Sequence, residues 1–291
     1  MIDLHTHSKY SDGIFRPAEV LRLAKERGIT TIALVDHDIT DGLPEAMATG
    51  ENFGIQVIPG VELSINENGA PCHILGFKIN AQNQHLQDAL GFLKEKRRER
   101  AKEIVKKLKT LGFQIEFEDL EKNSIGVMGK PHIASAILEK KENQAILQQF
   151  EKEAGTLRNA LFKRFLNPDQ PAFVEDNWKL SLESAINLIH QAGGLAFLAH
   201  PGSNLKSSYP PVPDWLIQKA IQLGLDGIEA YHHDNSPEQI QKFLKLARQN
   251  NLLISAGSDF HGYDAFNHLG YVDIEQTRPI TEDLIGKVWF S

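Results

Sequence analysis

Two histidines and two aspartates stand among the first dozen residues of the chain, which begins MIDLHTHSKYSDG. In an extended strand residues i and i+2 point to the same side, so His5 and His7 are expected to lie together, with Asp3 beside them. Neutral imidazoles suit zinc, manganese or iron, and a nearby carboxylate shifts the preference toward harder ions. The opening therefore predicts a metal site, although a histidine pair on a strand can also be structural.

Residues of the same types recur at the ends of the other apolar runs. They are Asp36, His37 and Asp38 after Val35, Glu62 after Val61, His73 near the start of the next run, His200 after Ala199, and Ser258, Asp259 and His261 after Ala256. In a parallel barrel these ends converge on one rim, where active sites are assembled. Six of the twelve histidines then meet in one place, whereas structural histidines would scatter over helices and loops.

The elements that must position these residues alternate between short β-rich runs and helical patterns, which favours a parallel sheet built from βα units. Strands are predicted at 2–4, 31–35, 56–61, 72–79, 195–199, 227–231 and 252–256. Helices are predicted at 17–27, 181–191, 213–223 and 236–250, and the last begins with a hydroxyl cap, a proline and a glutamine that can reach back. The periodicity predicts a barrel-like α/β fold.

The segment from about 81 to 179 breaks this rhythm and is predicted to be a helical, polar insertion, with 1–80 and 180–291 forming the barrel. Within it, residues 94–109 hold nine Lys or Arg against three Glu. By itself such a run is usually a solvated helix face. A second stretch, 129–134, sets Lys130 and His132 around a proline turn that can line the mouth of a pocket.

Composition limits the class of protein. The chain has 291 residues, 41% hydrophobic and 24% charged, which is ordinary for a soluble globular protein and excludes collagenous, disordered and membrane-spanning classes. The net charge of −7 argues against indiscriminate nucleic-acid binding. A single cysteine, Cys72, cannot form an internal disulfide, and the first motif follows Met1 directly, so we expect a cytoplasmic protein without a leader.

The motifs DLHTHSKYSDG, LVDHD, PGVEL, CHILG, LAHPG and SAGSDFHG, in this order, resemble the polymerase and histidinol phosphatase (PHP) family of metallophosphoesterases. The resemblance covers nearly the whole chain. It implies a distorted (β/α)7 barrel with up to three metal ions at the rim. KPHIA after the Arg-rich stretch, and GGLAFLAHPG, resemble the TrpH-like branch, whose members are also described as RNase AM-like nucleotide phosphoesterases.

Carried over residue by residue, the family pattern implies three ligand groups. The first metal would be held by His5, His7, Glu62 and Asp259. Glu62 would bridge to a second metal completed by His73 and His200, and Asp12, His37 and His261 would form a third site. Manganese is the expected ion, with iron and zinc as alternatives. The carboxylate of Asp12 gives the third site an oxygen ligand, which favours a harder ion.

Five other side chains near these motifs have roles to be decided. Asp3 and Asp38 are interpreted as carboxylates that orient imidazoles through the second ring nitrogen, with strand-end capping as the competing role. Cys72 adjoins a ligand and is interpreted as a small buried hydrophobe. His232 and His233, in EAYHHDN, are candidates for an acid or a substrate contact, with His232 preferred, and for either one a surface histidine is the rival.

The predicted chemistry is hydrolysis of a phosphate ester. Two metals about 3.5–4 Å apart can share a water and lower its pKa, so that hydroxide attacks phosphorus without a phosphoenzyme. The basic insertion can then clamp a second phosphate through Arg97, Arg100, Lys130 and His132. In the resembled branch the substrates are nucleoside 3',5'-bisphosphates, cleaved at the 3' ester, and short 5'-monophosphorylated RNA, shortened from its 5' end.

Three rival functions remain open at this stage. A histidinol-phosphate phosphatase shares the reaction, but Asp12 and the insertion count against it. An amidohydrolase-type metal hydrolase also begins with His-x-His, yet it usually bridges its metals with a lysine, and nothing equivalent accompanies Glu62. A non-enzymatic PHP module is the third rival. No membrane association or obligatory protein partner is expected.

Overall fold

The computed structural model describes residues 1–202, 210–263 and 269–270. The chain divides into two compact units, one formed by Met1–Leu90 with Lys179–Ser291 and the other by Gly91–Trp178. The predicted barrel range 180–291 therefore includes 203–209, 264–268 and 271–291, which lie outside the described residues. Helix α3 (Gln84–Thr110) runs across the first boundary between the units.

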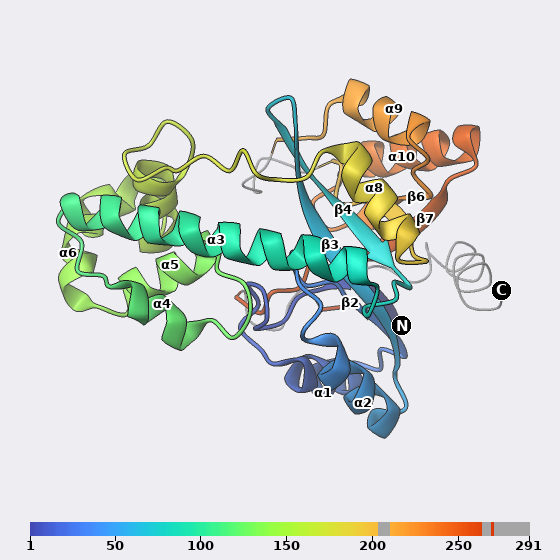
Figure 1. Cartoon of the computed structure of the whole chain (residues 1–291), viewed down its shortest axis with the longest axis horizontal. Coiled ribbons are helices and arrows are strands. Elements are labelled where there is room, and N and C mark those ends of the chain that lie inside the picture. Colours follow the sequence, from blue (N-terminus) through green and yellow to red (C-terminus); the bar gives the residue numbers. More distant parts are fainter. Residues whose placement is uncertain (203–209, 264–268, 271–291) are drawn as a thin grey trace. The chain divides into compact units, whose positions relative to one another are not determined.

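The first unit is built on a seven-stranded mixed sheet in the order β1 to β7. The fold class predicted from the sequence, a distorted seven-stranded α/β barrel with a helical insertion, is confirmed (Figure 1). Its strands are β1 (Ile2–Thr6), β2 (Thr31–Leu34), β3 (Gln56–Glu67), β4 (Ala70–Phe77), β5 (Leu195–Leu198), β6 (Gly227–His232) and β7 (Leu253–Gly257).

The fourth strand runs in the opposite direction to the one expected from βα units. β4 pairs antiparallel with both β3 and β5, whereas the other neighbours in the sheet are parallel. β3 and β4 form a long hairpin whose turn, Asn68-Gly69, has positive φ at both residues, as a type I′ turn requires. Because β4 is reversed, the beginning of this strand lies beside the end of β3, with His73 opposite Ser64.

The first and last strands meet just beyond their carboxyl ends. Thr6 forms a parallel bridge with Phe260, and the backbone amide of His7 donates to the carbonyl of Phe260 at 2.9 Å. The amide of Phe260 in turn donates to the carbonyl of His5 at 3.3 Å. This closure brings His5-Thr6-His7 beside Ser258-Asp259-Phe260-His261, which begins 253 positions later in the chain.

Amphipathic helices surround the sheet of the first unit. The predicted cap at Ser236 is confirmed, because its Oγ accepts from the amide of Gln239 while the Gln239 side chain accepts from the amide of Ser236 at 2.8 Å. A buried cluster that includes Leu4, Phe77 and Phe197 joins the strands. The helices are α1 (Pro17–Glu26), α2 (Leu43–Phe53), α8 (Leu182–Gln191), α9 (Asp214–Gln222) and α10 (Pro237–Asn250).

The second unit is helical and has a hydrophobic core of its own. The later part of α3 contributes Ala101, Ile104 and Leu108 to this core, and they pack with Leu120 and Ile137 from other helices of the unit. Its further helices are α4 (Phe117–Asn123), α5 (Lys130–Leu138), α6 (Lys141–Ala154), α7 (Leu157–Leu161) and the single π-helical turn η1 (Phe162–Leu166).

Among the residues that the structure describes, none of the helices combines the length and the apolar character needed to cross a bilayer.

Candidate metal centre

Four side chains from β1, β3 and the segment after β7 converge on one point. The Nε2 atoms of His5 and His7 lie 3.3 and 3.1 Å from Oε2 of Glu62, and 3.2 and 3.0 Å from Oδ1 of Asp259. The side chains of both histidines and of Glu62 are fully buried. All four atoms are shielded from solvent, and none has a hydrogen-bond partner in good geometry.

This arrangement fits a divalent cation better than a set of hydrogen bonds. Ligand atoms about 2.1 Å from one ion stand about 3.0 to 3.4 Å from one another, depending on whether the geometry is octahedral or tetrahedral. The four nitrogen–oxygen distances here, 3.0 to 3.3 Å, fall in that range. Leaving four buried polar atoms unpaired would otherwise cost several kcal/mol, at about 1–3 kcal/mol for each group.

The other oxygen of Glu62 faces a second group. Its Oε1 lies 2.9 Å from Nδ1 of His73 and 3.2 Å from Nε2 of His200. His37 joins the same carboxylate from the other side, with its Nδ1 3.0 Å from Oε2. Glu62, His37 and His73 together form a set close enough to hold one ion. Glu62 thus stands between the first group and the second.

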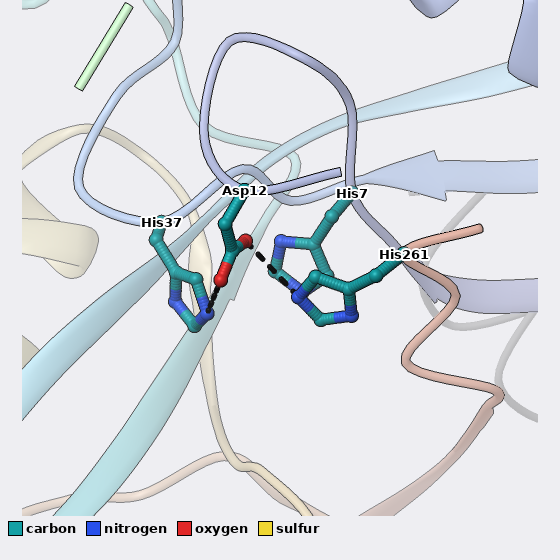
Figure 2. A group of neighbouring side chains, drawn as sticks. All are labelled: His7, Asp12, His37 and His261. Atoms are coloured by element: carbon teal, nitrogen blue, oxygen red, sulfur yellow. Dashed lines mark ion pairs between the residues drawn. The ribbon is translucent and has the colours of Figure 1, made fainter. Parts of the chain in front are cut away.

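Asp12 is the centre of the third group. Figure 2 shows its carboxylate between the rings of His37 and His261, with Oδ1 3.0 Å from Nε2 of His261 and Oδ2 3.8 Å from Nε2 of His37. The ring of His7 stacks on that of His261, with centroids 4.2 Å apart. All nine residues predicted as ligands from the sequence therefore lie in one connected cluster.

Strained backbone presents several of these groups. Three non-glycine residues in or next to the cluster have positive φ: Asp38, which follows His37, at 52°, His200 at 25° and Asp259 at 52°. Such conformations cost about 1–3 kcal/mol and persist where surrounding contacts enforce them, as at functional sites. Here the turn out of each strand is sharp, which keeps the side chain at the rim.

The carboxylates of the cluster are held in the ionised form that a cation requires. Burial alone raises the pKa of Glu62, but His37, His73 and other imidazoles around it outweigh burial and hold the pKa well below its usual value. The same balance between burial and neighbouring imidazoles keeps the pKa of Asp12 and of Asp259 well below the usual range.

The imidazoles are shifted in two directions. Burial lowers the pKa of His261, but Asp12 and Asp259 outweigh burial and raise that pKa to about 10. For His73 burial prevails over the attraction of Glu62, and its pKa falls to about 4. The ring of His73 is therefore neutral at pH 7, whereas a metal at the His261 group would have to displace a proton.

The side chains that orient the rings are not the ones expected. Asp3 accepts from Ser258, from the amide of Gly270 and from the amide of His5, and so contacts no ring nitrogen. Asp38 accepts from the amide of Ser64 at 2.9 Å. The strand-end role, weighed as the alternative for both residues, is the one that these contacts support.

Two side chains that sequence reasoning missed lie against ring nitrogens of the first group. Glu229 on β6 lies 3.0 and 3.2 Å from Nδ1 of His5. Ser11 lies 3.4 Å from Nδ1 of His7 and donates to Asp36 at 2.6 Å. A signal existed for Glu229, because a carboxylate in the middle of a buried strand needs a partner.

His232, the predicted catalytic residue, is buried at the end of β6. Its Nδ1 accepts from the amide of Asp234 at 3.2 Å, which places the proton of the neutral ring on Nε2. That Nε2 is buried without a hydrogen-bond partner. The ring centroid lies 5.5 Å from His200 and 6.3 Å from His5, so the surface-histidine alternative does not describe this residue.

The predicted phosphate contacts lie in the second unit. Arg97, Arg100 and Lys130 line one small pocket with Gly129, at the beginning of α5. His132 does not line it: its Nδ1 accepts from the amide of Gly129 at 3.1 Å and caps its own helix. Arg100 also donates from Nε to the carbonyl of Val174 at 2.8 Å.

Cys72 on β4 is buried, and burial raises the pKa of its thiol to about 12. It belongs to none of the candidate ligand groups found among the described residues, in agreement with its interpretation as a small buried hydrophobe.

Comparison with known proteins agrees with the motifs. A 5'-3' exoribonuclease from Haemophilus influenzae is 31% identical over 292 residues, covering 99% of this chain and 97% of that protein. A 3',5'-nucleoside bisphosphate phosphatase from Chromobacterium violaceum is 32% identical over 268 residues, covering 89% and 87%. A Bifidobacterium adolescentis protein, described by inference as a metal-dependent phosphoesterase, has a crystal structure that superposes with a TM-score of 0.81 at 27% identity, covering 96% and 95% of the two chains.

Residues 3–176, more than half of the chain, match the PHP domain as a family. This match agrees with the seven-stranded fold and with the order of the histidine and carboxylate motifs, and it shows that the chain belongs to the PHP domain family.

Proposed function

We propose that the protein is a metal-dependent phosphoesterase that hydrolyses nucleotide phosphoesters. The observation that carries the proposal is the meeting of His5, His7, Glu62 and Asp259 at 3.0–3.3 Å with no hydrogen bonds between the facing atoms. Two imidazoles and two carboxylates neutralise one divalent cation, and this donor set suits manganese, iron or zinc. We expect two to three ions in the full cluster, with manganese in the active form.

Bound divalent ions would supply a hydroxide near neutral pH and neutralise charge on the phosphoryl oxygens. The side chains of the cluster determine where the ions and the phosphate would lie. Glu62 faces the first group with Oε2 and the second with Oε1, and would hold an ion of each group next to the other. Asp12, His37 and His261 add a third set of ligands beside it.

His232 contributes a hydrogen-bond donor to the reacting phosphate or its leaving oxygen. Its Nδ1 is occupied by the amide of Asp234, so Nε2 carries the hydrogen and has no protein acceptor. A preorganised donor aimed where charge develops stabilises the transition state without reorganisation. We expect His232→Asn to lower kcat by 10- to 1000-fold with little change in metal content.

The substrate class that we propose is a nucleotide with more than one phosphate: a nucleoside 3',5'-bisphosphate cleaved at the 3' ester, or a short 5'-monophosphorylated RNA shortened from its 5' end. The relatives named above support this choice. The pocket lined by Arg97, Arg100 and Lys130 is the candidate phosphate-binding site, because three cations at the beginning of a nine-residue helix suit an anion.

The experiment is a phosphate-release screen of the manganese-loaded protein. It compares nucleoside 3',5'-bisphosphates, 3'- and 5'-mononucleotides, short 5'-phosphorylated RNA and histidinol phosphate, with an amide substrate as a further arm. We expect the bisphosphate and the 5'-phosphorylated RNA to be preferred, and chelation to abolish turnover. Preference for histidinol phosphate or for the amide would replace the proposal with the corresponding rival. Absence of turnover on every substrate would favour a non-enzymatic module.

The pocket is tested separately. Arg97→Ala, Arg100→Ala and Lys130→Ala are each expected to raise KM for the bisphosphate by 10-fold or more, since a charge-assisted hydrogen bond contributes about 1.5–3 kcal/mol. KM for a substrate with one phosphate should change much less. Equal effects on both substrates would remove the pocket from the proposal. Lys152→Ala, on α6 of the same unit, serves as the matched control.

A further inference from the structure

Glu229 is a fully buried carboxylate outside the three candidate ligand groups. It lies on β6, where all six residues of the strand are buried. Removing a carboxylate from water is costly unless its oxygens find donors. Glu229 has two donors, and each belongs to a different part of the candidate metal centre.

The first donor is the ring of His5. Both oxygens of Glu229 lie near its Nδ1, at 3.0 and 3.2 Å, while Nε2 of the same ring faces Glu62 and Asp259. A carboxylate at Nδ1 keeps a hydrogen on that nitrogen and leaves the lone pair on Nε2. This is the state in which an imidazole can bind a metal through Nε2.

The second donor is the backbone of His200. Its amide donates to Oε2 of Glu229 at 2.7 Å, and the residue has a φ of 25°, in the left-handed region that non-glycine residues rarely adopt. Asn235 supports the same turn, since its side-chain oxygen accepts from the amide of Gly202 at 3.1 Å. Glu229 thus holds the strained turn that presents His200 to Glu62.

The neighbouring strand leaves room for this arrangement. A Cβ added at Gly257 on β7 would stand 2.2 Å from Cβ of His5 and 2.6 Å from Oε1 of Glu229. Any side chain at this position would push His5 and Glu229 out of place. Gly257, Glu229 and His5 therefore pack tightly against one another, on β7, β6 and β1.

From these contacts we infer that Glu229 is a positioning residue that couples two groups of the metal centre, by keeping Nδ1 of His5 protonated and by fixing the backbone of His200. This inference rests on the proposed function, because it assigns Glu229 a role toward the ions of that site. We expect each acceptor oxygen that is removed at position 229 to weaken one further metal group. Removing a carboxylate with only a structural role would leave the metal groups intact.

The isosteric variant Glu229→Gln has one acceptor oxygen in place of two. The backbone amide of His200 can only donate, so the glutamine oxygen should face it and the glutamine NH2 should face Nδ1 of His5. The NH2 then takes the position of Oε1, which is the nearer of the two oxygens to Nδ1 at 3.0 Å, and disfavours a hydrogen on that nitrogen. We therefore expect His5 to carry its hydrogen on Nε2, which blocks binding at the first group. Glu229→Ala removes both contacts and should weaken the first and second groups together.

The test is zinc binding to the full chain, measured by titration calorimetry and by metal content after gel filtration, because zinc is diamagnetic and permits 15N NMR of the histidine rings. In Glu229→Gln we expect one ion to bind 10- to 100-fold more weakly. At a zinc concentration that saturates the wild type, the His5 ring should show Nδ1–H in the wild type and Nε2–H in this variant. In Glu229→Ala two ions should weaken. His5→Asn identifies the ring signal, and circular dichroism establishes that each variant is folded.

Glu67→Gln is the matched control, because Glu67 is also a buried carboxylate of the first unit, where it binds the amide of Leu182 and Lys219. It should bind zinc as the wild type does. Unchanged zinc affinity and an unchanged His5 signal in both Glu229 variants would overturn the inference while leaving the proposed function in place. If the wild type itself binds no divalent ion, the proposed function fails first, and the inference fails with it.

Discussion

Replacing Glu62 by glutamine removes the one charge that the first and second groups share. Oε2 of this carboxylate faces His5, His7 and His37, and Oε1 faces His73 and His200, all at 2.9–3.3 Å. Glutamine keeps the shape of the side chain, but one of its two terminal atoms becomes a donor and cannot ligate a cation. Glu62→Gln should therefore damage two groups at once.

The expected magnitude follows from this double role. Loss of a group that merely supports a ligand weakens metal affinity by about 10- to 100-fold, so loss of a ligand should cost at least about 100-fold, or about 2.7 kcal/mol for each ion. With two ions sharing Glu62, the joint loss is about 5 kcal/mol. We expect kcat/KM on a nucleoside bisphosphate to fall by at least 1000-fold, which corresponds to about 4 kcal/mol of transition-state stabilisation.

The assay measures metal content by mass spectrometry after equilibration with defined free manganese, together with phosphate release. Glu62→Gln should keep at most the ion of the Asp12 group, whereas Asp12→Asn should lose only that ion. Glu67→Gln, on the same strand, should keep the full complement. A Glu62→Gln protein that binds as many ions as the wild type, with similar affinity, would refute the assignment of Glu62 as a shared ligand.

Three further predictions concern packing, protons and the cysteine. Gly257→Ala should lower the unfolding temperature, because overpacking costs about 1–3 kcal/mol. Gly91→Ala, with open space around its Cβ, should not lower it. Equal unfolding temperatures for the two variants would contradict the contacts at Gly257. Burial lowers the pKa of His5, His37 and His200, but neighbouring carboxylates outweigh burial and raise these values, so at pH 7 metal must displace protons. Metal affinity should accordingly rise with pH up to the raised pKa of His261, about 10, and calorimetry in buffers of different ionisation enthalpy should detect proton release; a pH-independent affinity would contradict this sign. Cys72, with its pKa raised to about 12, should resist iodoacetamide at pH 8 in the native protein and react after denaturation, and rapid native labelling would show that it is not buried as described.

The strands, and the meeting of the polar residues that follow them, were predictable from the sequence because their signals are local. β-rich apolar runs located all seven strands, although β3 extends to Glu67, six residues beyond its predicted end, and the polar residues after each run stood where a barrel rim gathers them. The direction of β4 was not predicted, although Asn68-Gly69 carries a strong hairpin signal. That reversal explains how His73, near the beginning of a strand, reaches a rim formed by strand ends.

The orienting contacts escaped sequence reasoning because they join residues far apart in the chain. His5 and Glu229 are separated by 224 positions, and Gly257 matters only because β7 packs against both. Asp3 illustrates the opposite error, since its neighbours in sequence suggested a histidine partner while its carboxylate holds Ser258 and Gly270. Spacing identifies what a residue can do, and packing decides which partner it meets.

Anomalous diffraction from crystals soaked in manganese would locate the ions in the cluster. We expect a peak surrounded by His5, His7, Glu62 and Asp259, a second beside His73 and His200, and a third beside Asp12 and His261 at full loading. Crystals that show no anomalous peak within the cluster at saturating manganese would contradict this expectation.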